Sequence, residues 1–284
     1  MIERSPSSKA VPDDAEPGQG FFQRFLSDGR SSWIFILPGL LLLLLFGLPL
    51  LALVLHASNS TFFEYALSEQ ALDALRLSLI TSSITVVVTV ILGTPLAYLL
   101  ARWKFRLKAW VELLIDLPIV LPPSVAGLAL LIAFGRQGTF GAVLNQLGIT
   151  LPFTSAAVVM AQTFVAAPLY IRAARIGFRE IDHQLEEAAH VEGASPWQLF
   201  REVMLPLAGR ALTSGAILTW TRAIGEFGAT ILFAGNLEGV TQTMPMAIYL
   251  GFERSLGVAV ALSVMLMGVS TVLLLLTRRL DQKP

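Results

Sequence analysis

Cysteine is absent from this chain of 284 residues, and charged residues are scarce at 14% of the total. Without cysteine the chain has no disulfide, no thiolate ligand for zinc and no cysteine nucleophile. Its formal net charge is zero, which gives no reason to expect nucleic acid or an acidic substrate as a partner. Soluble domains carry charge on roughly a quarter of their residues. A chain with 55% hydrophobic residues and so little charge is typical of an integral membrane protein.

The motifs of several enzyme classes are also missing. No glycine-rich phosphate loop ending in Gly-Lys-Ser/Thr occurs, so we expect the chain not to hydrolyse ATP itself. Neither His-Glu-x-x-His nor Gly-x-Ser-x-Gly occurs. Glu187 and His190 have the spacing of one half of a carboxylate-bridged di-metal site, which needs a second copy and two further glutamates. The chain has only three histidines, so we expect no metal, no cofactor and no catalytic residue.

Long apolar runs make up most of the chain. A transmembrane helix needs about 20 apolar residues. Six segments reach or approach this length: residues 33–55, 77–100, 113–134, 155–171, 211–233 and 256–277. The third contains Pro118, Pro122 and Pro123, which bend a helix because proline has no backbone donor. The bend is either a packing kink or an opening onto a cavity. The sequence therefore predicts an all-α membrane protein with six transmembrane helices.

The positions of lysine and arginine predict the orientation, because cytoplasmic loops carry an excess of both. Six spans leave both termini on one side, and sixteen of the twenty lysines and arginines lie there. Arg76, Arg136 and Arg254 lie on the other side, and Arg222 falls inside the fifth span. Both termini are therefore predicted to be cytoplasmic. Residues 1–30 are polar and are expected to form a disordered tail, before a membrane domain at residues 31–284.

The loop between the fourth and fifth spans, at about residues 176–209, is polar and carries clear helix signals. Asp182 is placed to cap a first short helix that ends at Gly193, since glycine adopts the left-handed conformation at little cost. The start signals of a second helix follow: Ser195 as N-cap, Pro196 in the first turn and Gln198 completing a capping box. Pro206 is expected to end this second helix.

Trp197, Phe200 and Met204 fall on one face of the second helix. Two helices around a glycine, with apolar side chains at the cytoplasmic surface, suit either of two roles. They lie on lipid, or they dock a cytoplasmic partner. The physical pattern alone does not separate these alternatives.

The loop also meets a longer pattern: Glu-Ala-Ala, three residues, Gly, nine residues, an aliphatic residue, one residue and Leu-Pro. The matching residues are Glu187, Ala188, Ala189, Gly193, Val203, Leu205 and Pro206. This pattern resembles the signature loop of the membrane subunits of binding-protein-dependent ABC importers, with Val203 where isoleucine is usual. The resemblance implies a coupling loop that enters a groove on a separate ATPase subunit. Glu187 would meet the ATPase, with Trp197 or Phe200 filling the groove.

Other stretches resemble the molybdate permeases in particular: LPIVLPPSVAGLALL, GRQGTFG and RAIGEFGATILFAGNLEGVTQTMPMAIY. Sulfate permeases share GEFGA and a later TQT-P, so a sulfate or thiosulfate permease is the alternative. Tungstate has nearly the size, charge and shape of molybdate and is not separated from it. The resemblance runs from about residue 33 to the end of the chain. It implies the type I (MetI-like) importer architecture in the cytoplasmic membrane of a prokaryote.

The resemblance also implies the partners: a second copy of this chain, two copies of a cytoplasmic ATP-binding subunit and an external molybdate-binding protein. Lipid surrounds the helices, and no nucleic acid is expected. Closed twofold symmetry is the commonest arrangement of two identical subunits. Gly215, Gly225 and Gly228 in the fifth span are small enough to permit close helix approach.

The fifth span also carries a polar stripe, because Gly215, Thr219, Arg222, Glu226 and Ala229 have the spacing of one helix face. A lone arginine near the bilayer centre costs about 2.5–3.5 kcal/mol on insertion scales, and Glu226 one turn away can neutralise it. The pair is either a structural ion pair, or Thr219, Arg222 and Glu226 line the passage and Arg222 meets the anion. An intramembrane enzyme that uses Arg222 and Glu226 is the alternative from a different class.

Overall fold

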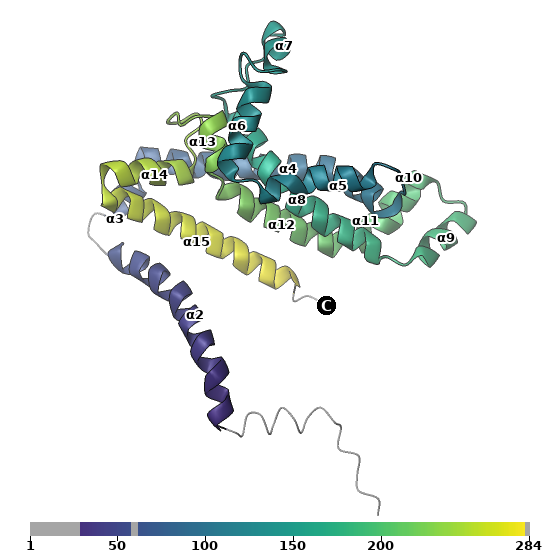
Figure 1. The fold of residues 1–284 in the computed structure, drawn as a ribbon, viewed down its shortest axis with the longest axis horizontal. Helices are drawn as coiled ribbons and strands as arrows, with labels where there is room; N and C mark the ends of the chain where they lie inside the picture. The colour runs from purple at the N-terminus through teal and green to yellow at the C-terminus, as the bar shows by residue number, and fades with distance from the viewer. Residues whose placement is uncertain (1–28, 58–61, 282–284) are drawn as a thin grey trace, which may run out of the picture. The chain divides into compact units, whose positions relative to one another are not determined.

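The computed structural model describes residues 29–57 and 62–281, in which it contains helices and no strand (Figure 1). This confirms the prediction of an all-α chain. The chain divides into two units, residues 1–55 and residues 56–284. Helix α2 (Gly29–His56) makes up the described part of the first unit, and only its last residue, His56, falls in the second. The predicted tail, residues 1–30, lies outside the described residues except for Gly29 and Arg30, which begin α2.

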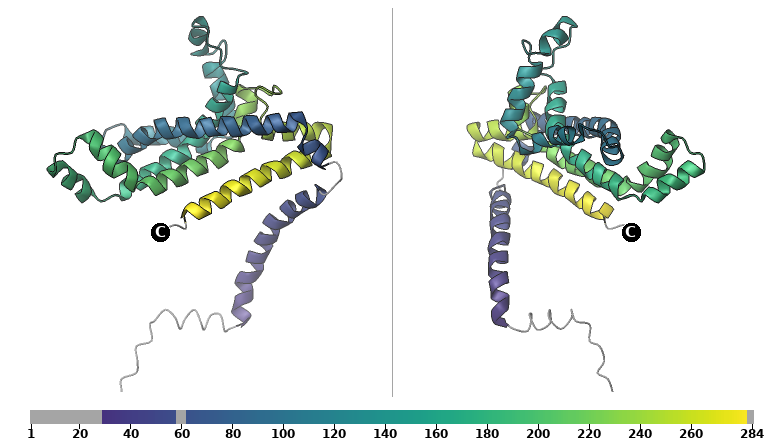
Figure 2. Two further views of the ribbon diagram at one scale, coloured as in Figure 1. Left: turned by 180° about the vertical axis from the view of Figure 1, so that it is seen from behind. Right: turned by 45° about the vertical axis from the view of Figure 1, so that its right-hand side comes forward.

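The second unit holds the remaining helices. They are α3 (Phe62–Ala66), α4 (Glu69–Arg102), α5 (Lys108–Val120), α6 (Pro123–Phe134), α7 (Gly141–Gln146), α8 (Ser155–Glu180), α9 (His183–Val191), α10 (Pro196–Gln198), the π-helix η1 (Leu199–Met204), α11 (Leu205–Leu207), α12 (Gly209–Ile224), α13 (Gly228–Phe233), α14 (Met244–Arg254) and α15 (Leu256–Asp281). Helices α4, α8 and α12 pack side by side, and α9 lies beyond one end of this group (Figures 1 and 2).

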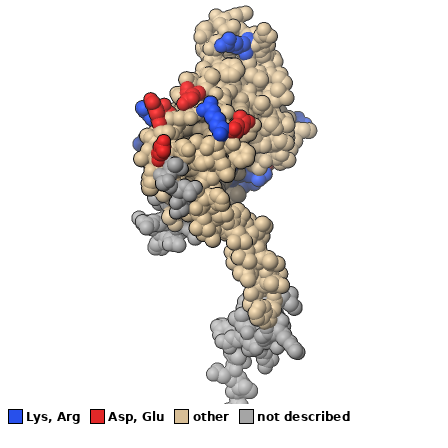
Figure 3. Space-filling view, turned by 90° about the vertical axis from the view of Figure 1, so that its left-hand side faces the viewer, with Lys and Arg blue, Asp and Glu red and all other residues tan. Residues whose placement is uncertain are grey.

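Four helices are long and apolar enough to cross a membrane by themselves, within the described residues. They correspond to the first, second, fourth and sixth predicted spans: Phe35–His56, Glu69–Arg102, Ser155–Glu180 and Leu256–Leu275. The third predicted span is broken as its prolines indicate, because α5 and α6 meet at 118°. The face of the molecule in Figure 3 is mostly uncharged, and its acidic side chains gather in one area.

The prediction of one continuous helix at residues 211–233 is wrong. Helix α12 ends at Ile224, and α13 begins only at Gly228. Two glycines, Gly225 and Gly228, flank the break and lower the cost of leaving the helix. The carboxylate of Glu226 then accepts a hydrogen bond from the backbone N–H of Ala229 at 2.9 Å, which satisfies one of the free N–H groups in the first turn of the new helix. Neither helix qualifies as a span by itself in the described part of the chain, so the count of six stays a prediction.

The serine and threonine residues of the second predicted span form a buried face of α4. The members are Ser78, Thr81, Ser82, Thr85, Thr89 and Thr94. The indole of Trp220 donates to Ser82 Oγ at 2.8 Å, and the backbone N–H of Met244 donates to Ser78 Oγ at 2.7 Å. Polar groups in a membrane are placed inside the bundle, where they find such partners. The polar face therefore fixes α4 against α12 and α14.

The second halves of the two broken spans, α6 and α13, pack through glycine. A Cβ atom at Gly127 would lie 2.7 Å from the carbonyl oxygen of Ala229 and 2.8 Å from its Cα atom. A Cβ atom at Gly228 would lie 2.8 Å from the Cβ atom of Pro123. Both distances are shorter than van der Waals contact, so the two backbones approach closely only because side chains are absent there.

We expect Gly127→Ala to lower the free energy of unfolding by about 1–3 kcal/mol, the usual cost of overpacking. The added methyl group meets backbone atoms of α13, which cannot rotate away. Thermal unfolding of the purified chain in detergent measures the effect. Gly268→Ala in α15 is the control, because no atom lies within 4 Å of a Cβ atom there. Equal melting temperatures for the two variants would contradict a tight contact between α6 and α13.

Candidate functional site

The first part of the loop folds as the sequence predicts. The side chain of Asp182 accepts a hydrogen bond from the backbone N–H of Gln184 at 3.0 Å and caps α9. Helix α9 ends at Val191, and Gly193 follows with φ +82°. The backbone N–H of Ala194 returns to the carbonyl of Ala189 at 2.9 Å, which satisfies one of the last carbonyls of the helix. The glycine turn is therefore confirmed.

The second helix starts as predicted and does not end as predicted. Ser195 and Gln198 form a capping box, with Gln198 N to Ser195 Oγ at 3.3 Å and Ser195 N to Gln198 Oε1 at 2.8 Å. Pro206 does not end the helix, because it lies in the first turn of α11 and the chain continues almost directly into α12. The π-helix η1 precedes it. The wider turns of η1 change which backbone N–H and carbonyl groups are paired just before Pro206, the residue that has no N–H to donate.

The three apolar side chains of this helix do not form one exposed face. Trp197 is 64% exposed, Phe200 is half-buried and Met204 is completely buried. The ring of Phe200 lies 5.0 Å from that of Tyr98 and 6.3 Å from that of Phe178. The helix runs from the exposed turn back into the bundle, so successive residues on one face pass from solvent into the core. Of these three side chains, only Trp197 projects into solvent.

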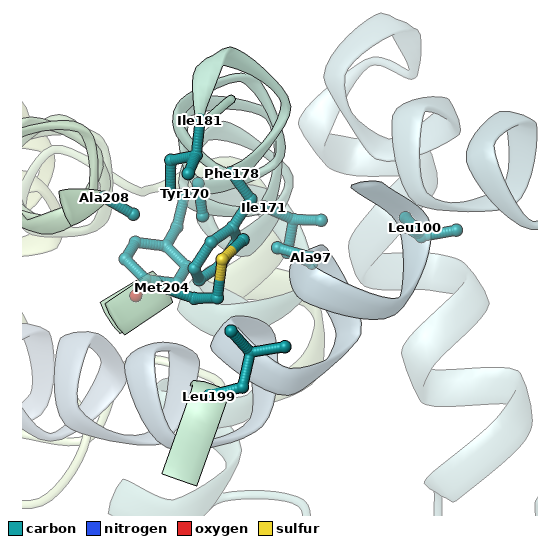
Figure 4. Close-up of a cluster of buried hydrophobic side chains, with 10 residues drawn as sticks. Ala97, Leu100, Tyr170, Ile171, Phe178, Ile181, Leu199, Met204 and Ala208 are labelled. Atoms are coloured by element: carbon teal, nitrogen blue, oxygen red, sulfur yellow. The ribbon is translucent and has the colours of Figure 1, made fainter. Parts of the chain in front are cut away.

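An apolar cluster attaches the end of this loop to the long helices (Figure 4). Leu199, Met204 and Ala208 come from the second half of the loop. The remaining members come from α4, α8 and the residue after α8: Ala97, Leu100, Tyr170, Ile171, Ala174, Phe178 and Ile181. All ten residues are buried. The loop is therefore held firmly at its base, while its tip is exposed.

The other residues of the Glu-Ala-Ala pattern lie at or near the surface of the loop. Glu187, Ala188 and Pro206 are exposed, whereas Ala189 and Leu205 are partly buried. In the described part of the chain, the Glu187 carboxylate has no hydrogen-bond or ion-pair partner. The neighbouring carboxylate, that of Glu186, does have a partner. The structure brings it to Arg102, one of the sixteen cations that the sequence places on the cytoplasmic side, and the two form an ion pair at 2.9 Å.

Arg222 and Glu226 form the ion pair that their spacing predicts. Arg222 Nη1 lies 2.6 Å from Glu226 Oε2, and the exposed fractions of the two side chains are 34% and 1%. The other carboxylate oxygen, Oε1, accepts the hydrogen bond from Ala229. Glu226 thus links the end of α12 to the start of α13, and both of its oxygens are occupied.

The predicted stripe is interrupted after Arg222, because Glu226 and Ala229 lie beyond the end of α12. Thr219 is buried and donates to the backbone carbonyl of Ala166 in α8 at 3.4 Å. A Cβ atom at Gly215 would lie 2.9 Å from the Cβ atom of Ala173, so Gly215 also faces α8. Only the extension of this helix face past Ile224 is wrong, because it assumed that the helix continues through the break. Gly215, Thr219 and Arg222 all lie within α12 at helical spacing, and the role of Thr219 in the passage stays a prediction. Gly215 and Gly228 serve contacts within the chain and give no support to approach by a second copy.

Comparison with known proteins identifies the family. Residues 93–284 match the family described as "Binding-protein-dependent transport system inner membrane component". The "Molybdenum transport system permease protein ModB" of Mycobacterium tuberculosis (strain ATCC 25618 / H37Rv) is 39% identical over 243 residues, which cover 86% of this chain and 92% of that protein. The "Probable transport system permease protein NifC" of Clostridium pasteurianum is 36% identical over 231 residues, 81% of each chain.

Solved structures confirm the fold. A chain from the crystal structure of a bacterial alginate ABC transporter, in complex with its alginate pentasaccharide-bound periplasmic protein, has a TM-score of 0.75 at 17% identity. The match covers 93% of this chain and 98% of that one. The inward-facing MetNI methionine ABC transporter gives a TM-score of 0.56 at 20% identity, covering 75% and 97%. The architecture is that of the MetI-like permeases. The chain therefore belongs to the family of inner membrane components of binding-protein-dependent transport systems, the permease subunits of ABC importers.

Proposed function

We propose that this chain is the permease subunit of an importer that moves molybdate across the cytoplasmic membrane. One observation carries the choice of substrate: identity of 39% with a permease named for molybdenum transport, over 86% of this chain. Tungstate, with nearly the same size, charge and shape, is expected to use the same route. A sulfate or thiosulfate permease is the alternative within the same class.

The energy comes from a separate ATPase subunit in this proposal, because the chain has no phosphate loop of its own. The coupling loop, residues 176–209, presents Glu187, Ala188 and Trp197 at its exposed tip. A free carboxylate and a projecting indole suit a docking surface, since aromatic anchors dominate many interfaces. The buried base of the loop supports the same role. It ties the tip to α4 and α8, so that a movement of the tip is passed on to the long helices.

The assembly in this proposal has two copies of the permease, two ATPase subunits and an external binding protein that delivers the anion. Both termini lie in the cytoplasm. The end of α4 at Arg102 and the coupling loop lie on one side of the bundle, because Arg102 contacts both Ile181 and Glu186. This supports the orientation that the excess of arginine and lysine predicts.

The intramembrane enzyme that uses Arg222 and Glu226 receives no support. A general base needs a carboxylate oxygen within reach of the proton that it removes. Both oxygens of Glu226 are occupied, one by the backbone N–H of Ala229 and one by Arg222. Its side chain is also 1% exposed. The pair is arranged to hold two helices together and not to act on a substrate by acid–base chemistry.

Uptake by the reconstituted complex tests the proposed function. Permease, ATPase and binding protein are combined in proteoliposomes, and uptake of labelled molybdate is measured with competing tungstate or sulfate. We expect tungstate to compete about as well as unlabelled molybdate, and sulfate to need at least a tenfold higher concentration. Vesicles without the binding protein are the control. Uptake driven equally well by sulfate would assign the chain to the sulfate permeases instead.

A further inference from the structure

Arg102 is the last residue of α4, and its side chain is only 5% exposed. All three nitrogen atoms of its guanidinium group lie close to partners in the loop, although Nε meets Glu186 as an ion pair and not in hydrogen-bond geometry. Nε lies 2.9 Å from Glu186 Oε1, Nη2 donates to the backbone carbonyl of Ile181 at 2.8 Å, and Nη1 lies 3.3 Å from the ring nitrogens of His183. All three partners lie at the start of the coupling loop. The rigid planar fork of arginine suits such a set of partners, which lysine cannot match.

Tyr98, one turn before Arg102, adds a contact to both sides of the loop. Its ring lies 5.4 Å from that of Phe178 at the end of α8, and 5.0 Å from that of Phe200 in η1. The end of α4 is therefore enclosed by the two ends of the loop. Within the described residues, Arg102 makes every hydrogen bond and ion pair that joins α4 to residues 181–208.

The contacts of Arg102 matter because α4 is not joined to the coupling loop through the backbone. Helices α8 and α12 continue directly into the coupling loop, so they follow its movement through the backbone. Helix α4 has no such connection and must follow through side chains alone. It then reaches the far part of the bundle through its buried polar face, which bonds Trp220 of α12 and the start of α14. A tight link at Arg102 makes α4 move with the loop.

We infer that Arg102 is a positioning residue that transmits the movement of the ATPase-bound coupling loop to α4. The inference rests on the proposed function, in which Glu187 and Trp197 meet the ATPase. Glu186 faces the bundle and holds Arg102, while Glu187, the next residue, faces the partner. In this proposal Glu186 takes part in transmitting the movement, and Glu187 takes part in docking the ATPase.

The first test compares Arg102→Gln with Arg106→Gln in the complete complex. Arg106 is an exposed cation of the same segment and serves as the matched control. We expect Arg102→Gln to assemble through the apolar cluster and to keep ATP hydrolysis within about twofold of the wild type. Its molybdate transported per ATP should fall at least fivefold. Arg106→Gln should keep the wild-type ratio.

Glu186→Gln should lower the same ratio by less, because Ile181 and His183 still hold Arg102. The double variant Arg102→Gln/Glu186→Gln should be no worse than Arg102→Gln alone, since both changes remove one link. An unchanged ratio in Arg102→Gln would overturn the inference. So would a loss of ATPase binding in that variant, which would make Arg102 part of the docking structure.

A second measurement has a wild-type arm that does not depend on the variant being stable. The chain has no cysteine, so engineered cysteines at Leu99 of α4 and His190 of α9 take spin labels at those positions alone. Labelled chains are diluted with unlabelled ones to isolate the distance within a chain. We expect this distance to stay the same in the wild-type complex with and without a non-hydrolysable ATP analogue, and to change in Arg102→Gln. A change in the wild type would overturn the inference.

Different results would disprove the proposed function and the role of Arg102. A wild-type complex that takes up no molybdate would remove the proposed substrate, and the ratio would then be measured with sulfate. Wild-type uptake with an unaltered ratio in Arg102→Gln would remove only the role of Arg102.

Discussion

Replacing Gly193 by valine should abolish uptake by the complex while the permease still inserts and folds. Gly193 has φ +82°, and a residue with a side chain loses roughly 1–2 kcal/mol in the left-handed region. Valine is worse than most, because it is branched at Cβ. No atom of the free chain lies within 4 Å of a Cβ atom at this position, so the fold itself tolerates the added side chain. The damage is therefore confined to the turn at the tip and to whatever docks against it.

Gly239→Val is the matched control for this experiment. Gly239 has φ +71°, and it too has no atom within 4 Å of a Cβ position. It belongs to the connection before α14 and lies near the start of α8, since Ser155 donates to the carbonyl of the next residue, Val240. The coupling loop follows the end of α8, 26 residues on, about 39 Å away at 1.5 Å per residue. The two variants carry the same backbone strain at opposite ends of one helix.

Uptake and ATP hydrolysis of both variants are measured in proteoliposomes. Gly193→Val should lose at least 90% of uptake and the stimulation of hydrolysis by the binding protein, whereas Gly239→Val should keep most of both. Equal losses in the two variants would mean that strain alone causes the defect. Full uptake by Gly193→Val would show that the loop does not couple the ATPase to transport.

Local signals in the sequence predicted the local features of the coupling loop correctly. The N-caps at Asp182 and Ser195 and the left-handed glycine depend on residues within a few positions of each other. Such rules operate before any tertiary contact forms. The prediction for the end of the second helix is wrong. Proline ends a helix only where the carbonyl that it cannot donate to finds no other donor. In this chain the π-helix η1 changes the hydrogen-bond pairing just before Pro206, so the helix continues past the proline.

The break after α12 was missed for a different reason. Counting apolar residues over a whole span averages out a short interruption, and Gly225-Glu226-Phe227-Gly228 is only four residues long. Two glycines around an acidic residue were the available signal. The carboxylate that bonds the first turn of α13 and neutralises Arg222 depends on both helices being in place. Spacing alone predicted the ion pair, but not the hydrogen bond from Ala229 to Glu226.

The difference between Glu186 and Glu187 could not be predicted from the sequence. Both occupy the same short helix and differ by one position. Their environments differ because Arg102, which is far away in the chain, lies beside α9 on the side that Glu186 faces. Which arginine meets which glutamate depends on the packing of α4 against α8, and that packing is set by tertiary contacts such as those around Tyr170 and Leu100.

The double variant Arg222→Gln/Glu226→Gln should assemble and hydrolyse ATP normally, yet take up less than a tenth of the wild-type amount of molybdate. The structure explains why both residues must be changed together. Removing one partner of a buried pair costs about 3–5 kcal/mol, because the other charge stays buried and unpaired. Glu226 is 1% exposed and would be that charge if Arg222 alone were replaced.

The double change leaves the helix contacts in place. Glutamine at 226 still has a side-chain oxygen to accept the hydrogen bond from the backbone N–H of Ala229, so the first turn of α13 keeps this partner. Its amide can bond the glutamine at 222, and neither position holds a charge. The variant therefore removes the guanidinium group from the bundle without removing the link between α12 and α13.

The expected loss of uptake comes from Arg222, whose side chain is 34% exposed beside a fully buried partner. Its Nη1 holds Glu226, and the exposed part of the guanidinium group is suited to a tetrahedral oxyanion, which it binds through paired N–H donors. Uptake is measured beside ATP hydrolysis that responds to the binding protein, so that assembly and transport are scored separately. Near-normal uptake by the assembled double variant would limit the pair to holding α12 and α13 together, and the passage would then have to run elsewhere.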